Sequence, residues 1–179
     1  MGVTENLRKL IAKPGMISMP GVFDAVSARL AEHAGFSAAF MSGFMVSASR
    51  IGLPDTGLIS YAEMADQGRN ICDSVSIPIV GDGDTGFGNS VNVKRTVKGY
   101  AAAGFACVMI EDQVSPKRCG HTKGKQIISR SEALQPAHPG LPRAVRGGGR
   151  GTSLGAALAL GRERALLLLG NLVHDIHDT

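Results

Sequence analysis

Two aspartates placed two residues apart give the first indication of chemistry in this sequence. Asp82 and Asp84 lie in the segment VGDGDTGFG (80–88), where an apolar run ends. In an extended chain, residues i and i+2 point to the same side, so both carboxylates face one spot. Such close like charges repel unless a cation lies between them, and Mg²⁺ or Mn²⁺ suits carboxylate oxygens. The alternative is that both side chains only cap a helix or form an Asx turn.

Further acidic residues occur at comparable places along the chain. Glu111 and Asp112 end the next apolar run, and adjacent strands that end in acids at one edge of a sheet favour the metal site. Asp55 lies in GLPDTG (52–57), where Pro-Asp followed closely by glycine is ordinary turn chemistry. On its residues alone, Asp55 is therefore assigned to a turn.

The segment PKRCGHTKGK (116–125) places a thiol and an imidazole in a cationic loop. Lys117, Arg118 and Lys123 surround Cys119 with positive charge, which favours anionic ligands such as carboxylates. A thiol there could deliver a proton to a developing carbanion, and His121 could share that task or orient a substrate. Cys-x-His alone is a weak zinc signal because further ligands are missing. These residues leave a functional thiol and a bystander equally open.

Alternating strand and helix patterns must position these side chains. Apolar runs predict strands over 16–20, 37–42, 77–82 and 105–112, and helical spacing predicts helices over 23–35, 60–75 and 90–104. Ser60 and Glu63 form a capping-box pattern, and Gly35 and Gly104 suit helix ends. Continuous apolar strands are typical of a parallel sheet buried on both faces, in a (β/α) barrel or a doubly wound sheet.

Composition limits the class of protein. The chain has 179 residues, 44% of them hydrophobic, with a formal net charge of +4 that forms no dense basic run. Few aromatic residues and dispersed charge argue against nucleic-acid binding. The most apolar window, 154–173, is interrupted by three adjacent charges, which argues against a membrane span. Three cysteines without a CxxC pair and the absence of a signal sequence favour a reducing compartment, with the cytoplasm as the default.

The pattern changes near residue 133. Ser129 and Glu132 look like a helix start, but three prolines follow within ten residues and block a helix interior. We therefore expect a partial barrel over 1–133 and a divergent tail over 134–179. Within the tail we predict a helix over 161–178 and no fifth strand. The tail's arginine, glycine, alanine and leucine composition suggests a shifted reading frame or an alternative C-terminus.

Taken together, the segments from about 14 to 133 resemble the isocitrate lyase/phosphoenolpyruvate mutase superfamily. The resemblance rests on an ordered set of motifs: PGVFDAVSARLAEHAGF, MSGF, GLPDTG, GDGDTGFGN, NVKRTVKGYAAAGFA, IEDQVSPKRCGHTKGK and SRSEA. The branch that it resembles most is the plant-type group labelled carboxyvinyl-carboxyphosphonate phosphorylmutase-like, near the methylisocitrate and alkylmalate lyases. The resemblance implies a (β/α)₈ TIM barrel, of which about four βα units and the site-bearing strand ends would be present here.

The resemblance also implies roles for particular residues. Asp82 would hold Mg²⁺ (or Mn²⁺) directly, with support through water from Asp55, Asp84 and Glu111. Ser42, Gly43 and Phe44 would bind the oxo-carboxylate end of the substrate. Gly120 would bind substrate from a gating loop. Lys117, Cys119 and His121 would be the catalytic residues of that loop, with Cys119 as the proton donor.

The implied reaction is cleavage of a carbon–carbon bond in a 2-hydroxy-dicarboxylate of the methylisocitrate or alkylmalate type, which yields a 2-oxoacid and a carboxylate. One alternative is an inactive, truncated member that acts only as a fragment or interaction partner. A second is an oxaloacetate hydrolase, a decarboxylase or a phosphonomutase of the same superfamily. The expected partner is a small dicarboxylate or oxoacid rather than a nucleic acid or a membrane, and homo-oligomers are typical of the superfamily.

Overall fold

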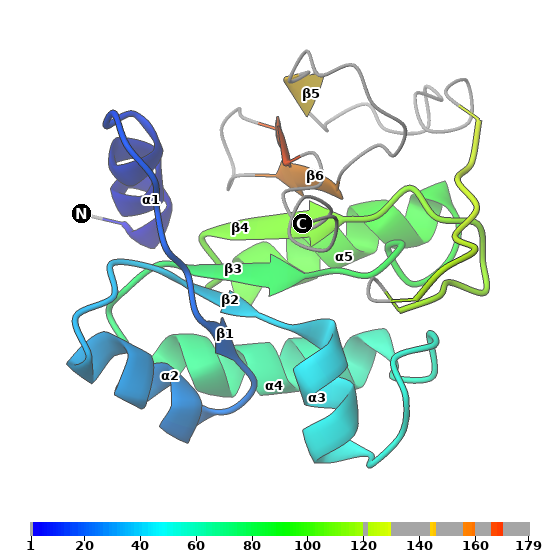
Figure 1. The fold of residues 1–179 in the computed structure, drawn as a ribbon, viewed down its shortest axis with the longest axis horizontal. Helices are drawn as coiled ribbons and strands as arrows, with labels where there is room; N and C mark the ends of the chain where they lie inside the picture. The colour runs from blue at the N-terminus through cyan, green and yellow to red at the C-terminus, as the bar shows by residue number, and fades with distance from the viewer. Residues whose placement is uncertain (1, 120–121, 130–143, 146–155, 160–165, 170–179) are drawn as a thin grey trace, which may run out of the picture.

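The computed structural model describes residues 2–119, 122–129, 144–145, 156–159 and 166–169 (Figure 1). Its helices are α1 (Val3–Ile11), α2 (Ala25–His33), α3 (Gly43–Arg50), α4 (Tyr61–Ser74) and α5 (Ser90–Ala102). Its strands are β1 (Gly21–Val22), β2 (Ala39–Met41), β3 (Ile79–Asp82), β4 (Cys107–Ile110), β5 (Ala144–Val145), β6 (Ala156–Ala159) and β7 (Leu166–Leu169).

Strands β1 to β4 form a parallel sheet in chain order. All four strands point the same way, so their carboxyl ends meet at one edge, at the arrowheads in Figure 1. The register pairs Met41 with Gly81, and Asp82 with Met109. The ends of β2, β3 and β4 are therefore level, which brings the segments that follow them together.

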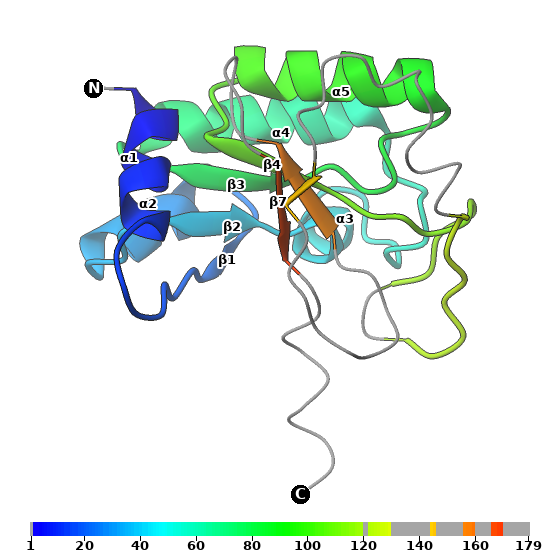
Figure 2. The ribbon, with the colours of Figure 1, turned by 90° about the horizontal axis from the view of Figure 1, so that it is seen from above.

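Alternate residues of these strands are buried on opposite faces of the sheet. On one face Met41, Ile79 and Val108 join a core with α2, α4 and α5. On the other face Val80 and Cys107 pack around Leu7 of α1. Figure 2 shows α4 and α5 side by side along the sheet, and α1 near the amino ends of the strands. This arrangement confirms the predicted parallel sheet buried on both faces.

The helices begin at the side-chain caps that the sequence indicates. Ser60 accepts a hydrogen bond from the Glu63 backbone while the Glu63 carboxylate accepts one from Ser60, which completes the predicted capping box of α4. At the other end of a helix, Gly35 and Gly104 adopt φ values of +86° and +97° one residue beyond the C-caps of α2 and α5. The predicted helices over 23–35, 60–75 and 90–104 are confirmed within a few residues.

Before residue 130, three features of the fold differ from the sequence-based expectation. Helices α1 and α3 were not predicted, and the first strand follows the expected run 16–20 instead of coinciding with it. The α3 segment is short and directly continues an apolar strand, so its period is hard to separate from that of the strand. Pro20 precedes β1 because proline lacks the N–H that a paired strand needs.

The segments described after residue 143 extend the same sheet. Strand β6 pairs antiparallel with β4 and with β7, and β7 pairs with β5. The expected absence of a fifth strand is therefore wrong, and so is the expected helix over 161–178, because Leu166–Leu169 forms β7. A run of four leucines has no helical period of its own and suits a buried strand equally well. The expected helix start at Ser129 and Glu132 lies largely outside the described residues.

The chain after β4, from Asp112 to Ile128, is called the strap, and its described residues are 112–119 and 122–128. Backbone hydrogen bonds close its base. Val114 N–H donates to Gln126 O at 2.8 Å, and Ile128 N–H donates to Asp112 O at 2.9 Å. Gln113 and Ile127 form an isolated antiparallel bridge between these bonds. The strap therefore begins and ends beyond the carboxyl ends of the strands, where Figure 1 shows the loop that follows β4.

Candidate functional site

Asp82 is the last residue of β3, and its carboxylate is buried. Its Oδ2 accepts a hydrogen bond from Gly43 N–H at 3.0 Å, at the first turn of α3. Its Oδ1 accepts one from Asp84 N–H, also at 3.0 Å. Burial raises the pKa of Asp82 despite the nearby Lys117 charge and these two donors. The structure thus holds one carboxylate in a fixed orientation where β2 and β3 end.

Asp84 lies two residues beyond β3 with its backbone in the left-handed region, at φ +49°. Its carbonyl accepts a 2.7 Å hydrogen bond from Glu111 N–H, which ties the exit of β3 to that of β4. Burial, together with the charge of Asp82, raises the pKa of Asp84 to about 7. The sequence pattern correctly anticipates that these two carboxylates are neighbours at the carboxyl edge of the sheet.

Lys117 reaches from the strap into this acidic cluster. Its ammonium lies 2.7 Å from Asp55 Oδ1 and also contacts Asp84 Oδ1. The Lys117 side chain is only 3% exposed, and Asp55 is also buried. Burial disfavours the ammonium charge, yet Asp84 and Asp82 raise the pKa of Lys117 above its ordinary value. Lys117 thus neutralises buried carboxylates, and Arg118 and Lys123 remain as the exposed cations of the predicted electropositive loop.

Glu111 follows β4 directly and joins the same cluster. Burial and the charge of Asp82 raise the pKa of Glu111. Its Oε2 accepts a 2.6 Å hydrogen bond from the side-chain amide of Gln113. Gln113 was not among the predicted site residues, although its position two residues after Glu111 in an extended segment places both side chains on one side of the chain.

The predicted substrate-binding segment begins α3. Ser42 is the N-cap, and its hydroxyl accepts a hydrogen bond from Met45 N–H at 3.4 Å. A Cβ at Gly43 would lie 2.8 Å from Asp82 Oδ2, so only glycine allows the helix to approach the carboxylate this closely. Phe44 is 44% exposed. The helix start therefore lies against Asp82 and leaves an aromatic side chain accessible.

Cys119 is half-buried, and its carbonyl accepts hydrogen bonds from the backbone and hydroxyl of Thr122 at 2.9 and 2.8 Å. It lies two residues after Lys117, whose side chain enters the acidic cluster. Gly120 and His121 lie outside the described residues. The predicted roles of all these side chains in substrate binding and catalysis stay predictions.

The donor set fits a hard divalent cation by its chemistry. Carboxylate oxygens are the ligands that Mg²⁺ and Mn²⁺ prefer, and burial raises the pKa of Asp82, Asp84 and Glu111, so a further positive charge would stabilise their ionised forms. In the described part of the chain, three His, Cys, Asp or Glu side chains do not converge on one point as a ready-made metal site. A cation held here would be bound by Asp55, Asp82, Asp84 and Glu111.

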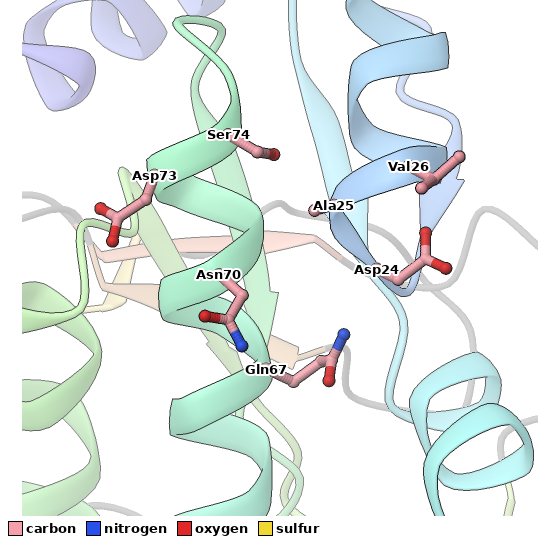
Figure 3. Close-up of a pocket in the computed structure, with 7 residues that line it drawn as sticks. All are labelled: Asp24, Ala25, Val26, Gln67, Asn70, Asp73 and Ser74. Carbon is pink, nitrogen blue, oxygen red and sulfur yellow. The ribbon is translucent and has the colours of Figure 1, made fainter.

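Two of the hollows on the surface of the described residues differ in their relation to this cluster. One, of about 500 Å³, borders the strap; it is lined by Thr56, Gln113, Val114, Ser115, Pro116, Lys117, Arg118, Gly124 and Gln126. The other, of about 560 Å³, is an open groove between the start of α2 and α4 (Figure 3). Its lining residues, Asp24 and Gln67 among them, include no member of the acidic cluster, whereas the hollow beside the strap is lined by Lys117, the ion-pair partner of Asp55 and Asp84. The hollow beside the strap is therefore the relevant one for chemistry.

None of the helices in the described ranges is long and apolar enough to cross a membrane.

Comparison with known proteins places this geometry in context. Residues 7–139 match the family model described as phosphoenolpyruvate phosphomutase. The chain is 47% identical over 131 residues to the chloroplastic carboxyvinyl-carboxyphosphonate phosphorylmutase of Arabidopsis thaliana, a match that covers 73% of the chain and 39% of the relative. It is 42% identical over 134 residues to 2,3-dimethylmalate lyase of Eubacterium barkeri, with 75% and 46% covered. The chain therefore spans less than half the length of these curated relatives.

Solved structures agree with this assignment. Oxaloacetate acetylhydrolase, in complex with 3,3-difluorooxalacetate, matches with a TM-score of 0.71 and 39% identity over 74% of this chain and 46% of that one. Phosphonopyruvate hydrolase, in complex with oxalate and Mg²⁺, matches with a TM-score of 0.67 and 34% identity over 74% and 45%. The four parallel strands and their helices thus correspond to part of a larger fold in these enzymes.

Proposed function

Because the chain belongs to the phosphoenolpyruvate mutase/isocitrate lyase superfamily, we propose that it is a Mg²⁺-dependent lyase that cleaves a carbon–carbon bond in a 2-hydroxy-dicarboxylate. The observation that supports this most is the cluster of buried Asp55, Asp82 and Asp84 with half-buried Glu111 near the carboxyl ends of parallel strands, beside a strap that carries a thiol. The likeness to 2,3-dimethylmalate lyase favours a substrate of the alkylmalate type.

In the proposed site, the carboxylate cluster would hold Mg²⁺, which when bound stabilises negative charge on substrate oxygens. Gly43 and Phe44, at the start of α3, would bind the oxoacid end of the substrate beside Asp82. Lys117, which enters the cluster from the strap and contacts Asp84, would supply positive charge close to the substrate oxygens. The strap above the hollow would keep water from the cleaved bond.

Cleavage of the bond between C2 and C3 of the substrate leaves its electron pair on C3 as an enolate-like carboxylate. The C2 hydroxyl would give its proton to bulk solvent as its oxygen becomes the carbonyl oxygen of a 2-oxoacid. Cys119 would then give its thiol proton to C3, and the second product would leave as a carboxylate. The Cys119 thiolate left after proton donation to C3 would take a proton back from solvent. By the same resemblance, His121 would share in catalysis and Gly120 in substrate binding.

A second candidate is hydrolysis of oxaloacetate, favoured by the 39% identity and TM-score of 0.71 to oxaloacetate acetylhydrolase. The two activities differ in their products, because the lyase releases a 2-oxoacid from an alkylmalate whereas the hydrolase releases oxalate and acetate from oxaloacetate. A non-catalytic role as an interaction partner of longer family members is the remaining alternative.

A substrate panel with Mg²⁺ tests the proposal. The purified chain is incubated with 2,3-dimethylmalate, other 2-alkylmalates and oxaloacetate, and 2-oxoacids and oxalate are measured. We expect oxoacid release from an alkylmalate that falls about a hundredfold or more in Cys119→Ser, within the usual range for loss of an acid–base group. Cys72→Ser is the matched control and should retain activity.

The binding arm of the test is independent of turnover. Mg²⁺ titrated calorimetrically into the wild-type chain should bind, and Asp82→Asn should abolish that binding. A folded chain that binds no Mg²⁺ and releases no product from any of these compounds contradicts the proposal and supports the non-catalytic alternative. Release of oxalate alone supports the hydrolase.

A further inference from the structure

We propose that Gln113 is a positioning residue. Its side-chain amide holds the strap backbone at Arg118, between Lys117 and Cys119, in a fixed position relative to the Glu111 carboxylate. The side chain is 8% exposed and makes hydrogen bonds to two separate parts of the chain. The inference rests on the proposed function only where it concerns catalysis. The contacts themselves and the test of the strap are independent of that function.

Each polar atom of the Gln113 amide has a partner of the correct type. Nε2 donates to Glu111 Oε2 at 2.6 Å and to Arg118 O at 3.0 Å, which uses both of its hydrogens. Oε1 accepts from Arg118 N–H at 3.1 Å. A flipped amide would turn its oxygen toward a carboxylate and a carbonyl, both of which are acceptors. The surroundings therefore select a single orientation of this side chain.

The bonds to Arg118 restrain the segment that carries the chemistry. Arg118 N–H belongs to the peptide that joins it to Lys117, and Arg118 C=O belongs to the peptide that joins it to Cys119. Both peptide groups are held by one amide, so the positions of the Lys117 ammonium and the Cys119 thiol depend on the same contact. Gln113 itself is held at the closed base of the strap, through its bridge to Ile127.

The third bond extends this restraint to the acidic cluster. The Gln113 amide donates to a Glu111 carboxylate whose backbone N–H in turn donates to Asp84 O. A change in the orientation of the Glu111 carboxylate would therefore disturb the same Gln113 amide that donates to the Arg118 carbonyl. Gln113 makes no contact with a reacting group in this arrangement, and it acts only through Glu111 and through the Arg118 peptides.

The substitution Gln113→Glu is the sharpest test because it preserves size. It replaces the donor to Arg118 O and Glu111 with an acceptor, and it places a second negative charge beside Glu111. Gln113→Met keeps the length and removes all three hydrogen bonds without adding charge. The matched control is Gln126→Glu, which makes the same chemical change at an exposed position of the same strap.

Two readouts report on the strap without needing activity. Trypsin cleaves after Lys117 and Arg118, and iodoacetamide alkylates Cys119; both rates rise when the segment opens locally. We expect both Gln113 variants to raise each rate about tenfold or more, since a lost hydrogen bond to a charged group changes an equilibrium by at least that factor. The control should match the wild type, and hydrogen exchange in α2 and α4 should be unchanged in all variants.

Unchanged cleavage and alkylation in both folded variants would overturn the inference, whatever the activity. If one variant does not fold, as judged by circular dichroism, the other decides. Where the chain is active, a positioning role lowers kcat more than it raises KM after kcat is corrected for the folded fraction of each variant, a correction that removes the effect of a general loss of stability. Loss of the proposed function therefore remains distinguishable from loss of the Gln113 contact.

Discussion

Among the individual side chains, Lys117 has the most consequential surroundings. Its ammonium is the direct ion-pair partner of both Asp55 and Asp84, and all three side chains are buried. Removing one partner from such a group leaves uncompensated charge in a region of low polarity, which costs far more than the loss of an exposed ion pair. The basic residue of the strap is thus also a structural counter-ion.

Replacing Lys117 with methionine should destabilise the metal-free protein by about 3–5 kcal/mol at about pH 8, and by less at about pH 5. Without the ammonium, the pKa of Asp84 rises further above the value of about 7 set by burial and Asp82. A carboxyl group with a raised pKa binds more protons in the folded state than in the unfolded one. The free energy of unfolding therefore falls as the pH rises from about 5 to about 8.

Urea denaturation of the Lys117→Met variant at both pH values measures this effect. Lys98→Met, on an exposed position of α5, is the control and should change the free energy of unfolding little at either pH. A Lys117→Met defect of equal size at both pH values would show that the carboxylates are not the cause.

The three cysteines should differ sharply in reactivity. Burial, with a smaller effect of Asp73, raises the pKa of the Cys72 thiol to about 12, and burial raises that of Cys107 above the ordinary range. At about pH 8 only about one Cys72 thiol in ten thousand is a thiolate, the form that reacts. We expect iodoacetamide to modify Cys119 in the folded protein faster than Cys72, which is also half-buried but has the raised thiol pKa, and to leave buried Cys107 intact.

Peptide mass spectrometry after alkylation checks this expectation, with the urea-unfolded chain as the control in which all three thiols react. Modification of Cys72 or Cys107 as fast as Cys119 in the folded chain would refute the burial argument.

Among the helices, α4 depends on one close contact with the sheet. A Cβ at Gly68 would overlap the ring of Phe105, which is 4% exposed and stacks on Tyr100 with ring centroids 4.6 Å apart. Neither ring has room to move, so the helix can approach the sheet only because position 68 lacks a side chain.

Gly68→Ala should therefore destabilise the protein by about 1–3 kcal/mol through overpacking, although alanine is normally favoured in a helix by about 1 kcal/mol. Gly2→Ala at the N-cap of α1 is the control, because a Cβ there would meet nothing within 4 Å. Thermal denaturation of both variants compares them. A stabilised Gly68→Ala variant would mean that α4 can shift away from Phe105.

Local signals predict the main helices and strands well because each depends on few neighbours. The Ser60–Glu63 capping box and the glycines after α2 and α5 fix helix ends within the sequence itself. Helix α3 escapes prediction because its packing against Asp82 depends on Gly43, a contact between segments 39 residues apart. The leucine run of β7 is likewise decided by its pairing with β6.

The same distinction applies to the site. The spacing of Asp82 and Asp84 and the acid after β4 suffice to predict a carboxylate cluster, since strand ends meet at one edge. The ion pairs of Lys117 and the amide contacts of Gln113 require the path of the strap in three dimensions, which sequence spacing does not provide.

Considered as a whole, the molecule has a sheet whose β4 edge is covered by a later part of the same chain. Four parallel strands match part of the longer relatives, and β6 pairs with β4 in antiparallel register, Met109 opposite Leu158. Pairing of this kind satisfies the backbone groups of an edge that would otherwise be available to another molecule.

A variant that stops after residue 143 loses β5, β6 and β7 and should self-associate. Its β4 edge presents unpaired N–H and C=O groups, which favour pairing between molecules. Sedimentation velocity over a range of concentrations should show larger species for this variant. A variant that lacks only residues 170–179 keeps every strand and is the control. Identical sedimentation of the two would show that β6 does not protect the edge.

The left-handed backbone of Asp84 also bears on which substitutions the position can tolerate. At φ +49°, asparagine and glycine adopt this conformation with little strain, whereas valine and isoleucine do not. In a saturation library sorted by a folding reporter rather than by turnover, we expect Asn and Gly to be enriched and β-branched residues to be depleted. Genetic drift from an active to an inactive sequence would therefore pass most easily through Asn or Gly at position 84, because the loop shape would survive the loss of the charge.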